Sequence, residues 1–185
     1  MEQNLIRRNL WNTASKAGLI LGTASAAYLF ITQWVGQAGM PAIAATIING
    51  ALWIAKFGGC IWLMMFFMKK FVAENKEADN SDTFRVGIVM ALLSALVYAA
   101  VSFANVAFIS TDLFTEQMET VMQQMAPMLD SNTLAQVDKT MQNLPQITFF
   151  SNLIYCFLYG MFLSFILSRT IPSKDPFAEY KPDEQ

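Results

Sequence analysis

The chain has 185 residues, of which 55% are hydrophobic and only 14% are charged, and its formal net charge is -2. A soluble domain carries about 25% charged residues, so this composition excludes most soluble classes and favours an integral membrane protein. The charge balance provides no basic surface for nucleic acid, and we expect no nucleic-acid partner. Because the chain has no His and only two Cys, we also expect no metal site and no cofactor.

The N-terminal region predicts a first membrane span at about residues 17–35, preceded by Arg7, Arg8 and Lys16. The apolar run is longer than the roughly 7 to 15 residues of a signal-peptide core. We therefore interpret it as a transmembrane helix and not as a cleaved leader.

A second apolar run predicts a span at about residues 47–68 and contains one charged residue, Lys56, near its middle. The run ends in Lys69-Lys70, as cytoplasmic ends of spans do, because loops on that side collect Lys and Arg. The turn before the run, residues 36–41, is short, so the first two spans should be antiparallel neighbours.

Two further apolar runs predict spans at about residues 86–109 and 147–167, with Arg85 and Arg169 at their basic ends. Between the second and third spans, residues 71–85 are polar and should form a solvated loop with a helix cap. The end of the chain, residues 171–185, contains three prolines and alternating charges, which predict a mobile cytoplasmic tail.

The placement of Lys and Arg predicts that both termini are cytoplasmic. The N-terminus, the loop at residues 69–85, and Arg169 with the C-terminal tail together hold ten of the twelve basic residues. The segment at residues 110–146 holds one basic residue, Lys139, against five acidic ones. It should therefore lie on the outer side of the membrane.

This outer segment, residues 110–146, predicts an amphipathic insertion of two helices between the third and fourth spans. In its first half, apolar residues recur at helical spacing up to a break at Pro127: Phe114, Met118, Val121, Met122 and Met125. That apolar face could lie on lipid, cover the outer mouth of the bundle, or bind a partner.

Lys56 is the strongest candidate for a polar site within the membrane, where a central lysine costs about 2.5 to 3.5 kcal/mol. It lies 13 residues from the basic pair that ends its span, near the middle of an apolar core about 30 Å thick. Counting from the basic ends of the third and fourth spans places Tyr98 and Tyr155 at nearly the same depth. The three residues could share a cavity that binds an anion or relays a proton. Alternatively, Lys56 snorkels to the surface or bonds to backbone carbonyls.

Small residues recur four apart in three of the spans: Ala14, Gly18, Gly22 and Ala26; Ala51, Ala55 and Gly59; Gly160, Ser164 and Ser168. Lipid gives helices no hydrophobic drive to associate, so close packing at such stripes must supply it. The stripes could pack helices within one bundle, which we favour, or between two copies. We interpret Cys60 and Cys156, both inside apolar runs, as packing groups.

Several stretches resemble domain-of-unknown-function family 4199, a family of small membrane proteins common in Bacteroidetes. They are GLILG at residues 18–22, LWIAKF at residues 52–57, TFRVGIVMALLSALVYA at residues 83–99, the acidic Met-rich segment that follows, and the tail around Asp175-Pro176-Phe177. The resemblance implies a four-span integral membrane protein whose family has no established activity, and it carries over no catalytic residues. We expect the protein in the bacterial inner membrane.

The predicted fold is all-α: a four-helix membrane bundle, residues 1–170, with the two-helix outer insertion. We expect a non-enzymatic interaction or structural subunit that lies in the lipid bilayer beside another membrane protein or a second copy of itself. The alternative is a small transporter, channel or ligand-binding bundle centred on Lys56, which predicts a polar cavity at mid-membrane. An enzyme is disfavoured, because the spans contain no carboxylate and the chain no His.

Overall fold

The computed structural model describes residues 2–125 and 130–171, which are helical throughout apart from short connections. Four long helices are α1 (Glu2–Gln37), α2 (Ala42–Glu74), α3 (Asn80–Ala104) with its π-helical extension η1 (Asn105–Ile109), and α6 (Leu144–Thr170). Two short helices are α4 (Thr111–Met125) and α5 (Ser131–Gln142).

The long helices are the four in the described chain that are long and apolar enough to cross a membrane. The predicted all-α membrane bundle is confirmed. The predicted break at Pro127 and nearly all of the predicted mobile tail lie outside the described residues.

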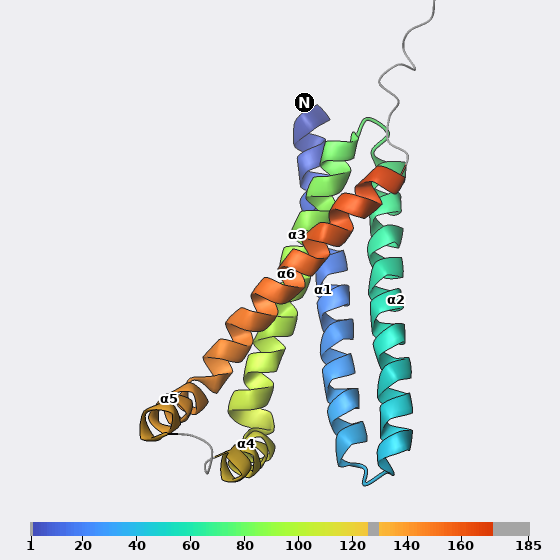
Figure 1. Ribbon diagram of the computed structural model, residues 1–185. Coiled ribbons are helices and arrows are strands. Elements are labelled where there is room, and N and C mark those ends of the chain that lie inside the picture. Colours follow the sequence, from blue (N-terminus) through green and yellow to red (C-terminus); the bar gives the residue numbers. More distant parts are fainter. Residues whose placement is uncertain (1, 126–129, 172–185) are drawn as a thin grey trace, which may run out of the picture.

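Helix α3 is the centre of the bundle and packs against α1 on one side and α6 on the other (Figure 1). Helix α2 lies beside α1 and has little contact with α6, which crosses α3 obliquely. The start of α1, the α2–α3 connection and the end of α6 meet at one end, which we call the N-terminal end. The α1–α2 turn and helices α4 and α5 lie at the other, which we call the insertion end.

The polar connection between α2 and α3 is shorter than the sequence predicted. Instead of a loop over residues 71–85, α2 continues to Glu74, because Phe71 is fully buried and still packs against the core. Asp79 then caps α3 by accepting a hydrogen bond of 2.7 Å from the backbone N–H of Asp82. The apolar contacts of one side chain thus carry the helix past the end of the apolar run.

Two of the three small-residue stripes pack within the bundle. On α1, a Cβ added at Gly22 would lie 2.6 Å from the Cβ of Val97 on α3. On α6, Ser164 is fully buried and donates a hydrogen bond of 2.9 Å to the carbonyl of Phe84. The backbones of these helices therefore approach more closely than any larger side chain would permit.

The third stripe, on α2, packs against nothing in the described chain. Ala51 and Ala55 are exposed, and a Cβ added at Gly59 would meet no atom within 4 Å. The expectation that the stripes pack within one bundle is therefore wrong for α2, because α2 contacts α1 through its opposite side.

The buried core lies in the N-terminal half of the bundle, where Met64, Met68 and Met90 are at most 2% exposed. Large apolar side chains instead face outward along the spans, with Trp34 72% and Ile43 78% exposed. In water such a surface would aggregate, whereas in a bilayer it meets acyl chains.

Candidate functional site

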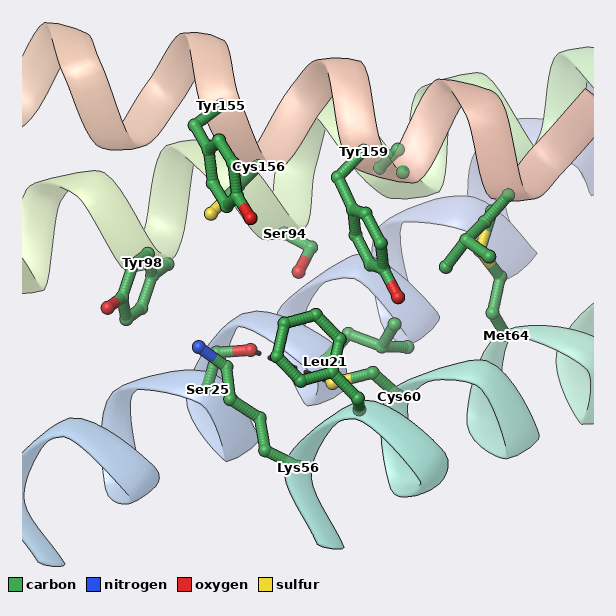
Figure 2. A pocket seen from close by; sticks show the side chains of 14 residues that line it. Leu21, Ser25, Lys56, Cys60, Met64, Ser94, Tyr98, Tyr155, Cys156 and Tyr159 are labelled. Atoms are coloured by element: carbon green, nitrogen blue, oxygen red, sulfur yellow. Dashed lines mark hydrogen bonds between the residues drawn. The ribbon is translucent and has the colours of Figure 1, made fainter. Parts of the chain in front are cut away.

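A cavity of about 80 Å³ lies at mid-span and is lined by all four long helices (Figure 2). Ser25 of α1 and Lys56 of α2 face Tyr98 of α3 and Tyr155 of α6 across it. Its volume exceeds the roughly 10 to 15 Å³ that one water molecule requires. The space can therefore hold a small ligand group.

The Lys56 side chain is held by aromatic rings. Its Nζ lies 4.7 Å from the ring centroid of Tyr28, 5.0 Å from that of Tyr98 and 5.8 Å from that of Phe57. Ring faces attract cations through their quadrupole. No carboxylate forms an ion pair with Lys56 among the described residues. The ammonium therefore has aromatic partners and no anionic one.

The structure brings Lys56, Tyr98 and Tyr155 to one cavity, and it places the Lys56 ammonium there instead of at an end of α2. Tyr155 lines the cavity and is nevertheless 65% exposed. The cavity wall is therefore open at α6, where α6 and α2 have little contact.

A larger cavity, about 650 Å³, lies at the insertion end, between α1, η1, α4 and α6. Along α3 and α6 its lining begins one helical turn from that of the Lys56 cavity. Ser102, which lines it, is one helical turn from Tyr98, and Asn152 is one turn from Cys156. The Ser102 hydroxyl is buried and makes no hydrogen bond of ordinary geometry among the described residues.

A closed ring of hydrogen bonds forms one wall of this larger cavity. Gln33 of α1 donates to the Ser110 hydroxyl at 2.6 Å, Ser110 donates to Asn105 Oδ1 at 3.0 Å, and Asn105 donates back to Gln33 Oε1 at 3.1 Å. Asn105 begins the π-helical turn η1 and Ser110 follows it, and such turns are often found at functional sites. The side chains of Gln33, Asn105 and Ser110 are thus hydrogen-bonded to one another without a ligand.

The predicted apolar face of the insertion contributes to the same cavity. Phe114, Met118 and Val121 of α4 line it, so this face covers the insertion end of the bundle. Met122 is half-buried, and the side chain of Met125 lies outside the described residues. The sequence left three positions open for this face: on lipid, over the outer mouth of the bundle, or against a partner. These contacts agree with the position over the outer mouth of the bundle.

Toward the N-terminal end, the Lys56 cavity is closed. Met64 forms part of its lining, and behind it Met68, Val86 and Met90 have no exposed surface. The bundle is therefore hollow in its insertion half and packed in its N-terminal half.

A sequence model of the family described as Protein of unknown function (DUF4199) matches residues 16–169. The chain belongs to this family. The match spans both cavities and confirms the resemblance seen in the sequence motifs. No curated protein and no solved structure matches the chain.

In this DUF4199 protein, sequence reasoning missed several cavity residues. Tyr28 was missed although it lies 12 residues after Lys16, so the counting that found Tyr98 could have found it. Cys60 and Cys156, interpreted as packing groups, both line the Lys56 cavity. Gln33, Ser102 and Asn105 carried only a weak signal, since uncharged polar residues also serve as ordinary contacts between spans.

Proposed function

We propose that this protein is a non-enzymatic, multi-pass membrane protein that binds an anionic, partly apolar small molecule at Lys56. One observation carries the proposal: the Lys56 ammonium faces a mid-span cavity and has no carboxylate partner among the described residues. A cation within the membrane-spanning region is stabilised by a counter-ion. Because no described carboxylate pairs with Lys56, an anionic ligand can supply the counter-ion.

The lining indicates the chemistry of the ligand. Around Lys56 the walls are mainly apolar and aromatic, with hydroxyl groups from Ser25, Ser94, Tyr98, Tyr155 and Tyr159. A small inorganic anion would use these donors but leave the apolar and aromatic walls without a contact. A carboxylate or sulfonate on an apolar body can place its charge at Lys56 and its body against the rings.

The positive-inside pattern supports a cytoplasmic N-terminal end and an outer insertion end, and we propose the bacterial inner membrane as the location. In that orientation the ligand reaches Lys56 from the outer side. Transport would further require that the packed methionine core open toward the cytoplasm. Binding from outside is therefore the first step of the proposed activity, and flux is its extension.

Benzoate is a suitable probe, because it joins one carboxylate to one ring. Saturation-transfer NMR on the protein in nanodiscs should detect benzoate binding, and Lys56→Met should weaken that binding about tenfold or more, or roughly 1.4 kcal/mol. The variant should fold, since it removes a charge that costs about 2.5 to 3.5 kcal/mol in the bilayer. Benzylamine, with the opposite charge, should not bind.

Lys70→Met is the matched control, because Lys70 is exposed and pairs with Glu74 at 3.8 Å near the end of α2. It should bind benzoate as the unaltered protein does. Equal affinity for benzoate in Lys56→Met would refute a ligand site at Lys56. If the unaltered protein binds benzoate, benzoate flux into liposomes then tests transport in the same pair of variants.

A second candidate function is an interaction subunit, favoured by the unpacked stripe on α2. Ala51, Ala55 and Gly59 leave a flat face with no neighbour in the described chain. Another span, from a second copy or from another membrane protein, could pack closely there. Ala55→Phe should release such a partner after purification in mild detergent, as judged by the mass of the complex. An unchanged mass would exclude α2 as the interface.

A further inference from the structure

A groove of about 540 Å³ lies between α1 and α3 at the N-terminal end, away from the Lys56 cavity. Arg7 and Trp11 line it from α1, and Asp82 and Arg85 from α3. Leu10 and Val89 add apolar surface. Two guanidinium groups and one carboxylate give the groove a net charge of about +1 near neutral pH.

Most of the hydrogen-bonding capacity of Arg85 is free for a ligand. Its Nη1 lies 3.5 Å from Asp82 Oδ1, and its side chain is 67% exposed. A guanidinium has five N–H donors, so one contact with Asp82 orients the group without saturating it. Arg7, exposed on the facing helix, forms no ion pair among the described residues.

The depth of the groove matches a membrane boundary. Gly18 of α1 packs against Met90 and Leu93 of α3, and the same offset places Trp11 level with Arg85. Trp11 is 51% exposed, as suits an indole at a lipid interface. Arg7 lies one turn beyond Trp11, toward the headgroups, while Val89 lies one turn beyond Arg85, toward the acyl chains.

We propose that this groove binds an anionic phospholipid. Guanidinium groups bind phosphate through paired, charge-assisted hydrogen bonds, and here one is offered by each helix. Val89, one turn below Arg85, gives the groove an apolar surface in the direction that the glycerol and acyl chains would take. Basic pockets between spans at the cytoplasmic face suit such headgroups. A free phosphate would use the arginines but leave Val89 and Trp11 uncovered.

The test is native mass spectrometry of the protein released from nanodiscs of phosphatidylglycerol and phosphatidylcholine in equal amounts. The protein should retain phosphatidylglycerol about tenfold more often than phosphatidylcholine, a preference of roughly 1.4 kcal/mol. The double substitution Arg7→Gln and Arg85→Gln should abolish that preference. Both side chains are exposed, so the variant should keep its thermal unfolding profile.

Arg8→Gln is the matched control, because Arg8 is the exposed neighbour of Arg7 and does not line the groove. It should keep the preference. Equal retention of both lipids, or an unchanged preference in the double variant, would overturn the proposal. Displacement of the lipid by millimolar inorganic phosphate would also overturn it, by identifying a phosphate site. The result is independent of benzoate binding at Lys56.

Discussion

The side-chain amide of Asn105 donates a hydrogen bond of 3.1 Å to Oε1 of Gln33 and so joins α3 to α1 across 72 residues of sequence. Asn105 is 2% exposed and also accepts from Ser110. Within a membrane, such a bond contributes about 0.6 kcal/mol on average and up to about 1.7.

Asn105→Leu should therefore destabilise the bundle by about 1 to 2 kcal/mol, because it removes both bonds of Asn105 at once. Thermal unfolding in detergent measures the loss. Thr32→Val is the control, since the Thr32 hydroxyl bonds only to carbonyls of its own helix. If both variants lose the same stability, the ring does not hold the helices together.

Close packing of α1 on α3 predicts that Gly22→Ala is destabilising. The added Cβ would lie 2.6 Å from the Cβ of Val97 and 3.0 Å from the backbone oxygen of Ser94, so a helix must move. Overpacking of this kind costs about 1 to 3 kcal/mol. Thermal unfolding again measures the change.

Gly58→Ala provides the comparison, because a Cβ at that position meets nothing within 4 Å. Ala is a better helix former than Gly by about 1 kcal/mol, so this variant should be neutral or slightly more stable. If Gly22→Ala and Gly58→Ala lose equal thermal stability, the loss does not come from the contact with Val97.

The two cavities predict that the two native thiols can be labelled from the insertion side. Cys60 and Cys156 line the Lys56 cavity, and Ser102, one turn from Tyr98, lines the larger one. A membrane-impermeant thiosulfonate added outside oriented vesicles should modify them, and mass spectrometry of the intact protein counts the adducts. Ser102→Phe should slow the reaction by filling the part of the larger cavity next to Tyr98.

The charge of Lys56 adds a second prediction to this labelling. An anionic sulfonatoethyl reagent should react faster than a cationic trimethylammonioethyl reagent of similar size, because the ammonium attracts it in a low-dielectric site. Lys56→Met should remove the difference. Faster labelling from the cytoplasmic side would contradict the direction of opening.

The N-cap of α5 predicts a pH-dependent helix. Hydrogen bonds from the hydroxyl and the backbone N–H of Thr133 hold the pKa of the Asp130 carboxyl below its ordinary value. A lowered pKa stabilises the helix above the ordinary value of about 3.9, and this stabilisation is lost as the pH falls through the native pKa. Hydrogen exchange of α5 should therefore accelerate below pH of about 4, relative to Asp130→Asn at the same pH. Asn caps without titrating, and a constant ratio between the two proteins would show that Asp130 does not hold the helix.

The fold was accessible from the sequence because a bilayer imposes a strong pattern. Apolar runs interrupted only by Lys56 predict spans, and the spacing of Phe114, Met118 and Val121 predicts the amphipathic helix that covers the insertion end. The extension of α2 past residue 70 was not predicted, because it depends on the tertiary burial of Phe71 and not on local polarity.

The site was only partly accessible, for a similar reason. Counting residues from the basic ends of the spans gives the depth of each residue in the membrane. Lys56, Tyr98 and Tyr155 have nearly the same depth, and this predicted that they lie together. Depth does not give the direction in which a residue faces around the helix. The unpacked face of Ala51, Ala55 and Gly59 and the ring through Gln33 depend on that direction, which is set by contacts between distant segments.

One thioether side chain, that of Met64, borders the Lys56 cavity toward the N-terminal end, and Met68 and Met90 belong to the same buried core. Methionine is unbranched and changes rotamer at small cost. These side chains can therefore move while the glycine and serine contacts that hold α1 and α6 against α3 stay in place. Rotation of Met64 alone would accordingly enlarge the Lys56 cavity within a fixed helical frame.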